Sequence, residues 1–182
     1  MIIELEGNWT KGWAMSRHTK PSVSGNGYDY TKVGKWVNRL KYHGENSYIE
    51  KIASHMSNVL SQDITPHFDI IIPVPHSIER KEQPVVKLAQ KIANNINKPM
   101  SSTLLRKTKK TDAIKNLNTS EKVTQLRGAF TINESYAGKS ILVVDDLYAS
   151  GSTLKEITNT LFQEGKVSKV YVITATRTGW HK

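Results

Sequence analysis

The chain has 182 residues, a formal net charge of +10 and no cysteine. This length suits one domain with a single core, and the lack of cysteine excludes disulfides, thiolate zinc sites and cysteine nucleophiles. No apolar run approaches the ~20 residues that span a bilayer, and residues 1–4 lack the basic start of a signal peptide, so we expect a cytoplasmic protein with no membrane partner.

The N-terminal residues predict a small hairpin followed by a surface loop. Residues 1–16 alternate loosely between apolar and polar, with Gly7 and Asn8 at the turn. In residues 17–30, proline, glycine, serine and asparagine interrupt any regular pattern, which is typical of a loop.

Two helices are expected next. Apolar residues recur at helical spacing in residues 33–40 and again from Ser47 to Leu60. Ser47 and Glu50 have the spacing of a capping box at the start of the second helix. We assign residues 1–65 to a hood that packs on a core of residues 66–182, within one structural domain.

The remaining chain alternates strands with helices, which predicts an α/β fold with a doubly wound, mostly parallel sheet flanked by helices. A helix begins at Pro84, because proline is favoured at the first helical position. Strands are expected at residues 69–72, 103–105, 129–132, 141–144 and 170–174.

The most informative stretch is residues 141–153. Four apolar residues predict a buried strand that stops at two acids, Asp145 and Asp146. A turn of small residues follows, and then a helix that Thr153 and Glu156 would cap and Gly165 would stop. A turn at a helix N-terminus favours phosphate, because free N–H groups and the helix dipole point at it.

Residues 106–127 form a basic segment, with seven lysines and arginines against two acids. Loops of this length in compact domains are functional or disordered, and a solvated charged hairpin is the simpler interpretation. Few apolar residues there can offset the entropy of ordering. We therefore expect a flexible basic loop, open without a ligand.

Residues 141–153 resemble the phosphoribosyl diphosphate (PRPP) motif of type I phosphoribosyltransferases. The resemblance implies the fold of that family, with a hood and a mobile basic loop that closes over PRPP. It assigns the ribose hydroxyls to Asp145 and Asp146. The 5′-phosphate is assigned to Ala149, Ser150, Gly151, Ser152 and Thr153. Tyr148 and Ala149 depart from the family pattern, where an aliphatic residue and a threonine are usual.

Further segments resemble the ComF-like (GntX-like) branch of this family, although the N-terminal zinc ribbon of that branch is missing. The matching pieces are residues 40–44, 73–80, 128–130 and 174–177. The resemblance places pyrophosphate near Val74, Pro75, His76, Ser77 and Arg80, and under Arg106, Lys107 and Lys109. It implies a Mg²⁺ ion held mainly by PRPP, with Asp145 as a further ligand. Trp36 and Tyr42 are candidates to stack on an acceptor base.

The expected activity is transfer of the 5-phosphoribosyl group to a nitrogen acceptor, such as a nucleobase, with release of pyrophosphate. The alternative is a PRPP-sensing or nucleic-acid-associated protein without turnover, since a basic chain also suits nucleic acid. We expect the chain to bind nucleic acid only weakly and without sequence specificity. A receiver-like phosphohydrolase would also end a strand in acids, but it needs no Ser/Gly/Thr turn. A homodimer is compatible with these expectations.

Overall fold

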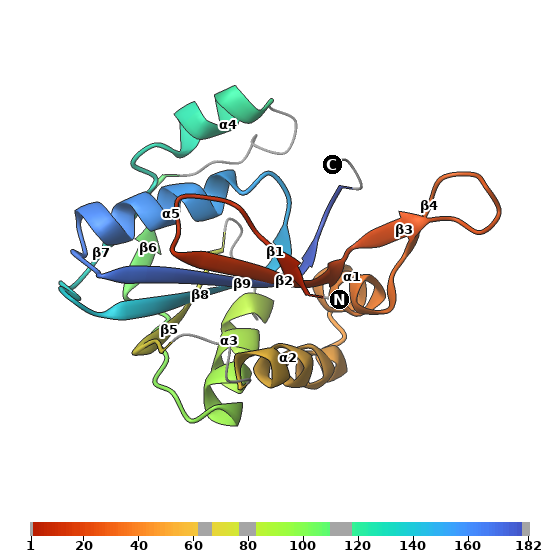
Figure 1. Cartoon of the computed structure of the whole chain (residues 1–182), viewed down its shortest axis with the longest axis horizontal. Coiled ribbons are helices and arrows are strands. Elements are labelled where there is room, and N and C mark those ends of the chain that lie inside the picture. The colour runs from red at the N-terminus through yellow and green to blue at the C-terminus, as the bar shows by residue number, and fades with distance from the viewer. Residues whose placement is uncertain (1, 62–66, 77–82, 110–117, 180–182) are drawn as a thin grey trace.

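The computed structural model describes residues 2–61, 67–76, 83–109 and 118–179. Its centre is a five-stranded sheet in the order β1-β2-β9-β8-β5 (Figure 1). The bounds are β1 Ile3–Glu4, β2 Lys11–Arg17, β5 Ile70–Pro73, β8 Ser140–Tyr148 and β9 Lys169–Arg177. Strands β2, β9, β8 and β5 run parallel, and β1 joins one edge antiparallel. The predicted doubly wound, mostly parallel sheet is confirmed.

Helices cover both faces of this sheet (Figure 1). Helices α1 (Lys32–His43), α2 (Ser47–Leu60) and α3 (Pro84–Asn95) pack on one face, and α5 (Ser152–Gln163) packs on the other. Side chains alternate along a strand, so Leu142 and Val144 of β8 meet α1 to α3 whereas Ile141 and Val143 meet α5. None of the described helices has both the length and the apolar character to cross a membrane.

The N-terminal hairpin is part of the sheet. Its second strand, β2, pairs in parallel with β9 along residues 11–17. The hairpin therefore extends the central sheet and does not form a separate hood layer, and a division of the chain at residue 65 stays a prediction. The expected loop at residues 17–30 contains a short antiparallel arm, β3 (Thr19–Pro21) with β4 (Tyr28–Tyr30), which projects from the body (Figure 1).

The motif strand is longer than its sequence pattern predicted. β8 continues through both acids to Tyr148, because Asp145, Leu147 and Tyr148 still pair with β9. Apolarity marks where a strand is buried and not where its ladder ends. The two predicted N-caps are also wrong: Gly151 caps the start of α5 and Asn46 caps the start of α2, neither with a side-chain hydrogen bond. The predicted stop at Gly165 agrees with the end of α5 at Gln163.

The described parts of the basic segment contain a strand and a helix, in contrast to the loop expected from its charge. It begins with β6 (Leu105–Lys107), which pairs antiparallel with β7 (Phe130–Ile132) in a separate ribbon. It then includes α4 (Thr119–Leu126), where Leu126 is buried against the α5 side of the core. The expected strands at 103–105 and 129–132 thus belong to this ribbon and not to the main sheet. Residues 110–117 lie outside the described residues, and loop closure stays a prediction.

A close approach at Gly34 sets the position of α1. A methyl group on Gly34 would overlap the backbone carbonyl oxygen of His18, so α1 touches the end of β2 without a side chain between them. Thr31 caps the helix, accepting the Gly34 N–H at 3.0 Å and donating to the Arg17 carbonyl at 2.6 Å. The start of α1 is therefore held against the sheet.

Replacing Gly34 by alanine should lower the free energy of unfolding by about 1–2 kcal/mol, because overpacking displaces α1. In an open helix position the same change is stabilising by roughly 0.5–1 kcal/mol. Urea unfolding of Gly34→Ala and of Lys35→Ala, an exposed neighbour on the same helix, measures the difference. Stabilisation by Gly34→Ala would contradict the close approach.

Candidate functional site

A hollow of about 240 Å³ lies where β5 and β8 end. In open α/β sheets ligands bind at the carboxyl ends of the strands, so this position is the expected one. Its walls come from the end of β8, the segment after β5, the first turn of α3, the β6–β7 ribbon and α1. The lining residues are Lys41, Val74, Pro75, His76, Gln83, Pro84, Val85, Val86, Lys107, Phe130, Asp145, Asp146, Leu147 and Thr153.

The two acids share this hollow but leave β8 on opposite faces. Asp146 is 4% exposed, and its backbone N–H donates to Asp145 Oδ1 at 2.8 Å. Burial, together with the neighbouring charge of Asp146, raises the pKa of Asp145 to about 8, although the charge of Lys41 opposes the shift. Two carboxylates this close, one of them buried, resist carrying two charges, so a cation nearby stabilises the charged pair.

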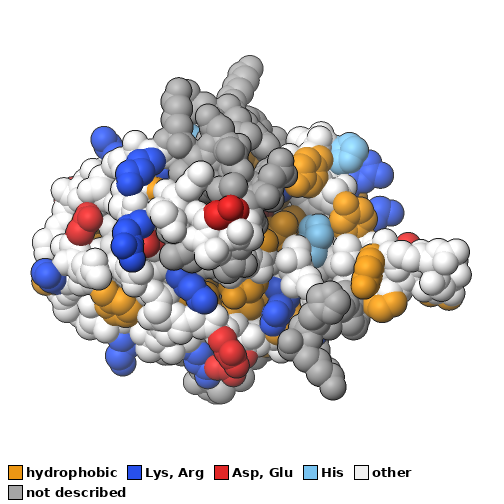
Figure 2. All heavy atoms as spheres, turned by 90° about the horizontal axis from the view of Figure 1, so that it is seen from above, with side chains coloured by type: hydrophobic (Ala, Val, Ile, Leu, Met, Phe, Trp, Pro, Cys, Tyr) orange, Lys and Arg blue, Asp and Glu red, His pale blue; other side chains and the backbone are white. Residues whose placement is uncertain are grey.

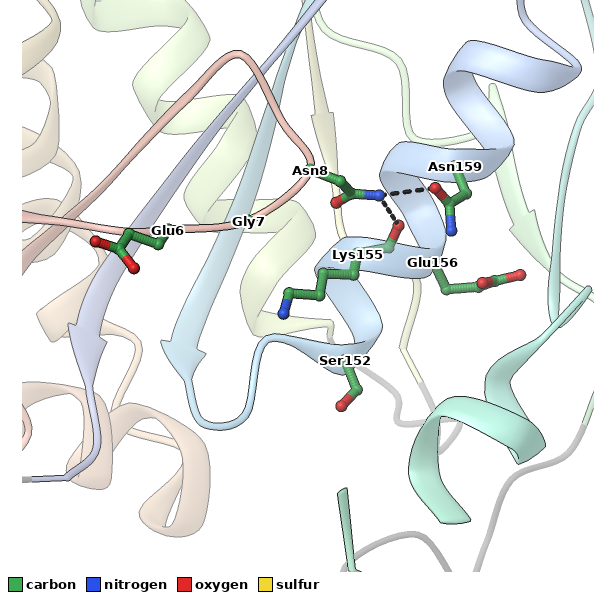
Figure 3. A pocket seen from close by; sticks show the side chains of 7 residues that line it. All are labelled: Glu6, Gly7, Asn8, Ser152, Lys155, Glu156 and Asn159. Atoms are coloured by element: carbon green, nitrogen blue, oxygen red, sulfur yellow. Dashed lines mark hydrogen bonds between the residues drawn. The ribbon is translucent and has the colours of Figure 1, made fainter. Parts of the chain in front are cut away.

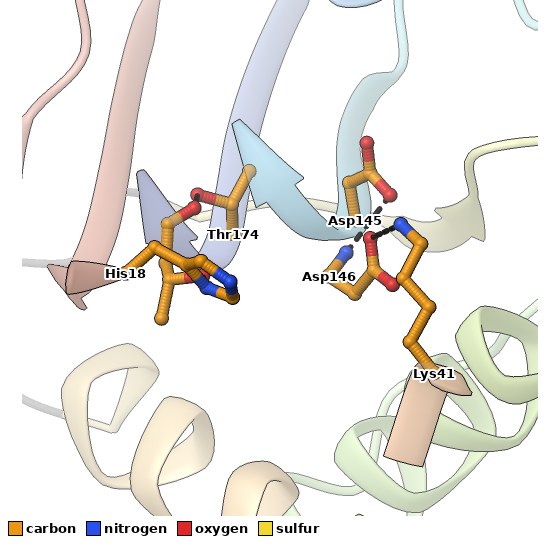
Figure 4. A network of polar contacts seen from close by, with 6 residues as sticks. His18, Lys41, Asp145, Asp146 and Thr174 are labelled. Atoms are coloured by element: carbon orange, nitrogen blue, oxygen red, sulfur yellow. Dashed lines mark hydrogen bonds and ion pairs between the residues drawn. The ribbon is translucent and has the colours of Figure 1, made fainter. Parts of the chain in front are cut away.

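Lys41 provides that cation, and it was not among the residues proposed from the sequence. Its Nζ lies 3.0 Å from Asp146 Oδ1, reaching from the last turn of α1 (Figure 4). Burial alone would lower the pKa of Lys41, but the charges of Asp146 and Asp145 raise it above its usual value. The available signal was its register, because Lys41 follows Val33 and Val37 at four-residue intervals on the buried stripe of α1.

His18 lies on the opposite side of the acid pair from Lys41 (Figure 4). Its Nδ1 is 3.0 Å from the Thr176 hydroxyl, and its ring meets Tyr30 edge-on. Burial lowers the pKa of His18, although Asp146 opposes the shift. The imidazole is therefore neutral at physiological pH.

The turn after β8 has the features expected of an anion cradle. Gly151 adopts a left-handed conformation with φ of 73° and begins α5. The first N–H groups of any α-helix lack intrahelical partners. Thr153 faces the hollow with the acids, whereas Ser152 lines a second hollow behind α5. The hydroxyl oxygens of Ser150 and Ser152 lie 2.9 Å apart.

Tyr148, the unusual residue before this turn, packs behind it. A Cβ atom on Gly151 would lie 2.6 Å from the Tyr148 hydroxyl. The Tyr148 ring meets Trp9 edge-on, with centroids 6.3 Å apart, and the Arg177 guanidinium lies 5.8 Å from its centroid. Tyr148 thus fills the space where the turn approaches the core.

The structure brings together some of the residues that the family resemblance places near pyrophosphate. Val74, Pro75, His76 and Lys107 line the hollow. Arg106 is next to Lys107 in β6, and since side chains alternate it lines a different hollow with Asn133 and Tyr136.

Among the described residues, the other cations and aromatic residues proposed for the site do not line the hollow. Lys109 donates to the Arg127 carbonyl at 2.7 Å. Ser77 and Arg80 lie outside the described residues. Trp36 packs partly buried against the α1–α3 core under Lys32, and Tyr42 is 59% exposed. A base-stacking role for Trp36 and Tyr42 stays a prediction.

Few of the described side chains at the hollow could coordinate a metal ion. The described residues contain no group of three or more His, Cys, Asp or Glu side chains that could hold one. Asp145 and Asp146 are hard oxygen donors, but Lys41 already occupies one Asp146 oxygen. This arrangement fits a Mg²⁺ ion whose other ligands are phosphate oxygens and water.

A larger hollow, of about 570 Å³, lies between the β1–β2 turn and α5 (Figure 3). Asn8 bridges the two elements, donating to the Lys155 carbonyl at 3.0 Å and to Asn159 Oδ1 at 2.7 Å. Its lining holds neither of the paired acids, so size alone does not mark the reactive site.

Comparison with known proteins agrees with the motif. A profile of the phosphoribosyl transferase domain family matches residues 48–179. Competence protein ComFC of Bacillus subtilis is 28% identical over 158 residues, which are 82% of this chain and 62% of that protein. Amidophosphoribosyltransferase of Saccharomyces cerevisiae is 30% identical over 135 residues, which are 74% of this chain and 24% of that protein. The chain therefore spans less than two thirds of either relative.

Solved structures with a similar arrangement include a glutamine PRPP amidotransferase from Bacillus subtilis, with TM-score 0.48 and 15% identity, covering 85% of this chain and 35% of that one. A hypoxanthine phosphoribosyltransferase from Staphylococcus aureus has TM-score 0.45 and 17% identity, covering 71% of this chain and 62% of that one.

Proposed function

Because the chain belongs to the phosphoribosyl transferase domain family, we propose that it binds PRPP with Mg²⁺ and transfers the 5-phosphoribosyl group to a nitrogen acceptor. The observation that carries this proposal is the shared hollow: Asp145, Asp146, Thr153 and Lys107 line one space of about 240 Å³. Carboxylates accept from ribose hydroxyls, and a helix N-terminus and cations suit phosphates.

In this proposal the donor spans the hollow from the turn to the β6–β7 ribbon. The 5′-phosphate lies at residues 149–153 on the start of α5, and the ribose lies over the acid pair. The pyrophosphate extends toward His76 and Lys107, which line the opposite wall. Each part of the donor then meets groups of matching chemistry: N–H and hydroxyl groups at the 5′-phosphate, carboxylates at the ribose hydroxyls and a cation at the pyrophosphate.

The reaction breaks the C1–O bond to pyrophosphate and forms a C1–N bond to the acceptor. Pyrophosphate leaves with the bonding electron pair, and the acceptor nitrogen loses a proton. Positive charge develops at C1 and negative charge on the leaving oxygens, so the protein contributes mainly positioning and electrostatic stabilisation. Bound Mg²⁺ would neutralise charge on the departing pyrophosphate.

The acceptor is a nucleobase or another nitrogen nucleophile in this proposal. The alternative, a PRPP-sensing or nucleic-acid-associated protein, draws on the net charge of +10. On the face that Figure 2 shows, the described lysine and arginine side chains are spread out and do not form one band. A binding surface for a nucleic-acid backbone usually gathers its cations in a stripe or patch, and this face shows none among the described side chains. Phosphoribosyl transfer is preferred because the two acids, Thr153 and Lys107 line one hollow.

The direct test is pyrophosphate release from PRPP with Mg²⁺ and a panel of nucleobases and other amines. We expect release that depends on both Mg²⁺ and one acceptor, with a phosphoribosylated product of matching mass. Tight PRPP binding with no release for any acceptor would favour the sensing alternative. No PRPP binding at all would contradict the proposal.

Replacing Lys107 by alanine should lower kcat about tenfold, since it removes one partly screened, charge-assisted contact to the leaving group. KM for PRPP should change less, because the charge is greatest in the transition state. Arg106→Ala, the neighbouring cation on the other face of β6, is the matched comparison and should have a smaller effect. Steady-state kinetics showing the larger loss in Arg106→Ala would contradict this placement.

A further inference from the structure

His18 lies at the ligand end of the sheet, directly after the last residue of β2, and the proposed reaction has given it no role so far. In the strand order β2-β9-β8-β5 it stands on the opposite side of β8 from β5, and the segment after β5 carries His76. The acids of β8 therefore lie between His18 and the wall proposed for pyrophosphate. Figure 4 shows the imidazole pointing toward the acid pair.

The proposed reaction brings its acceptor to this side of the acids. A single displacement at C1 of a sugar needs the nucleophile on the face opposite the leaving group. Pyrophosphate leaves toward His76 and Lys107, so the acceptor nitrogen approaches C1 from the side of β9 and β2. Side chains at the carboxyl ends of these two strands are therefore the ones placed to contact the acceptor.

The backbone holds His18 firmly in this position. Its N–H donates to the Arg177 carbonyl at 2.7 Å, and its carbonyl accepts the Thr31 N–H at 3.1 Å. Gly34 of α1 packs directly against the same carbonyl oxygen. Because the residue is already fixed, little conformational entropy is lost when a ligand meets its side chain.

The contact with Thr176 determines what the imidazole offers to a ligand. Thr176 is fully buried, and within the described part of the chain its hydroxyl group has one partner, His18 Nδ1 at 3.0 Å. The hydroxyl proton is satisfied when it is donated to Nδ1, which leaves the proton of the neutral ring on Nε2. No described residue hydrogen-bonds to Nε2. His18 therefore presents an N–H donor at the edge of the site.

Tyr30 adds an aromatic ring beside this donor. Its ring centroid lies 5.3 Å from that of His18, and the two planes are inclined at 86°. The Tyr30 hydroxyl accepts from Asn38 Nδ2 of α1 at 3.0 Å, so the base of the β3–β4 arm is tied to the helix. Tyr30 is still 46% exposed. A planar ligand that stacks on one of two perpendicular rings turns its edge toward the other, so His18 and Tyr30 form an aromatic corner.

We propose that His18 and Tyr30 select the acceptor, and that the acceptor is a planar heteroaromatic base and not ammonia or an alkyl amine. Proteins commonly bind bases by stacking on aromatic side chains and by hydrogen bonds to the base edge. In this inference, which rests on the proposed transferase function, the base packs in the aromatic corner and its edge accepts the Nε2 proton. The base therefore carries a carbonyl oxygen or an unprotonated ring nitrogen near its attacking nitrogen.

Steady-state kinetics with Mg·PRPP test this selection. The acceptors are adenine, guanine, hypoxanthine and uracil, with ammonia as the probe that has no ring, and the wild type should use at least one base in preference to ammonia. Tyr30→Ala removes a ring, and His18→Phe keeps a ring without the N–H donor. Each should raise the KM for that base about tenfold, the usual effect of one lost stacking contact or hydrogen bond, and the KM for PRPP less.

Two further variants separate recognition from folding. Tyr30→Phe keeps the ring and should recover most of the affinity for the base. Tyr28→Ala removes an exposed tyrosine further out on the same arm, opposite Pro21, and should keep the KM of the wild type. A merely structural contact between His18 and Tyr30 would lower the melting temperature without changing the preference among acceptors. Thermal melting checks each variant, and His18→Ala replaces His18→Phe if the latter does not fold.

A second readout does not depend on turnover. The ring current of a stacked base shifts the ring-proton NMR signals of His18, which are assigned by their loss in His18→Phe. With Mg²⁺ and pyrophosphate present, at least one of the four bases should shift these signals in the wild type and in Tyr28→Ala, at lower concentration than in Tyr30→Ala. Ammonium should not shift them.

Transfer to ammonia alone, or a KM for the base that neither Tyr30→Ala nor His18→Phe changes, would overturn the inference and leave phosphoribosyl transfer intact. A wild-type protein that binds no Mg·PRPP would instead overturn the proposed function. The NMR signals of His18 would in that case still decide whether a base binds in the aromatic corner, and no shift with any of the four bases would overturn the inference as well.

Discussion

At pH 9, above the pKa of about 8 of Asp145, Asp145→Asn should weaken Mg·PRPP binding by about 1.5–3 kcal/mol, the range for losing a charged hydrogen-bond acceptor. That corresponds to roughly 10- to 150-fold in Kd. The asparagine keeps an oxygen that can accept the Asp146 N–H, which Asp145 accepts at 2.8 Å. The local backbone should therefore be preserved, and calorimetry would measure the loss of the Asp145 carboxylate from the site.

The stability of the Asp145→Asn variant can be compared with that of the wild type as a control for folding. The pKa of Asp145 is raised in the folded protein, so folding disfavours its charged form. Stability should then fall as pH rises from the unfolded pKa near 4 toward the folded value. An asparagine side chain does not ionise, so Asp145→Asn should be at least as stable as the wild type at pH 8. Asp146→Asn is a poorer test because it leaves Lys41 without its carboxylate partner. Unchanged PRPP affinity in a folded Asp145→Asn variant would remove the acid pair from the site.

Gly151→Ala should reduce PRPP affinity by about 100-fold, the loss expected when hydrogen bonds to a charged phosphate, worth up to about 3 kcal/mol, are displaced. Two effects combine at this position. The left-handed backbone, with φ of 73°, costs an L-residue roughly 1–2 kcal/mol. The new methyl group would also lie 2.6 Å from the Tyr148 hydroxyl, and that ring is enclosed by Trp9 and Arg177. The turn must move, and its N–H groups move with it.

Gly138→Ala is the matched control. Gly138 has the same φ of 73° but nothing within 4 Å of the position of a Cβ atom. Both variants should lose similar stability from the backbone, while Gly151→Ala alone should lose PRPP binding. Equal PRPP affinity in the two variants, measured by calorimetry, would contradict a phosphate cradle at this turn.

Much of the fold could be predicted because its signals are local. Apolar runs such as residues 170–173 indicated the buried strands, and Pro84 marked the start of α3. The ends of elements were less predictable, since the ladder between β8 and β9 continues through Asp145 to Tyr148. The pairing of strands could not be predicted from local sequence patterns either, because β2 pairs with β9, which lies near the other end of the chain.

In the candidate site too, residues that are contiguous in sequence could be predicted, and residues that only the fold brings together could not. Residues 145–153 could be identified because the acids, the turn and the helix start are contiguous in sequence. Lys41 could not be assigned, because its contact with Asp146 depends on how α1 packs against the sheet. The separation of Arg106 from Lys107 into two hollows follows from the β6–β7 ribbon, which the charge pattern alone did not predict.

The most direct test of the central claim is a crystal structure of the protein with Mg·PRPP. We predict the ribose over Asp145 and Asp146, the 5′-phosphate at residues 149–153 and the pyrophosphate beside Lys107. The ligand could also enter the larger hollow behind α5, where Asn8 contacts Lys155. PRPP bound in that larger hollow, with the acid pair still engaged only by Lys41, would contradict the account.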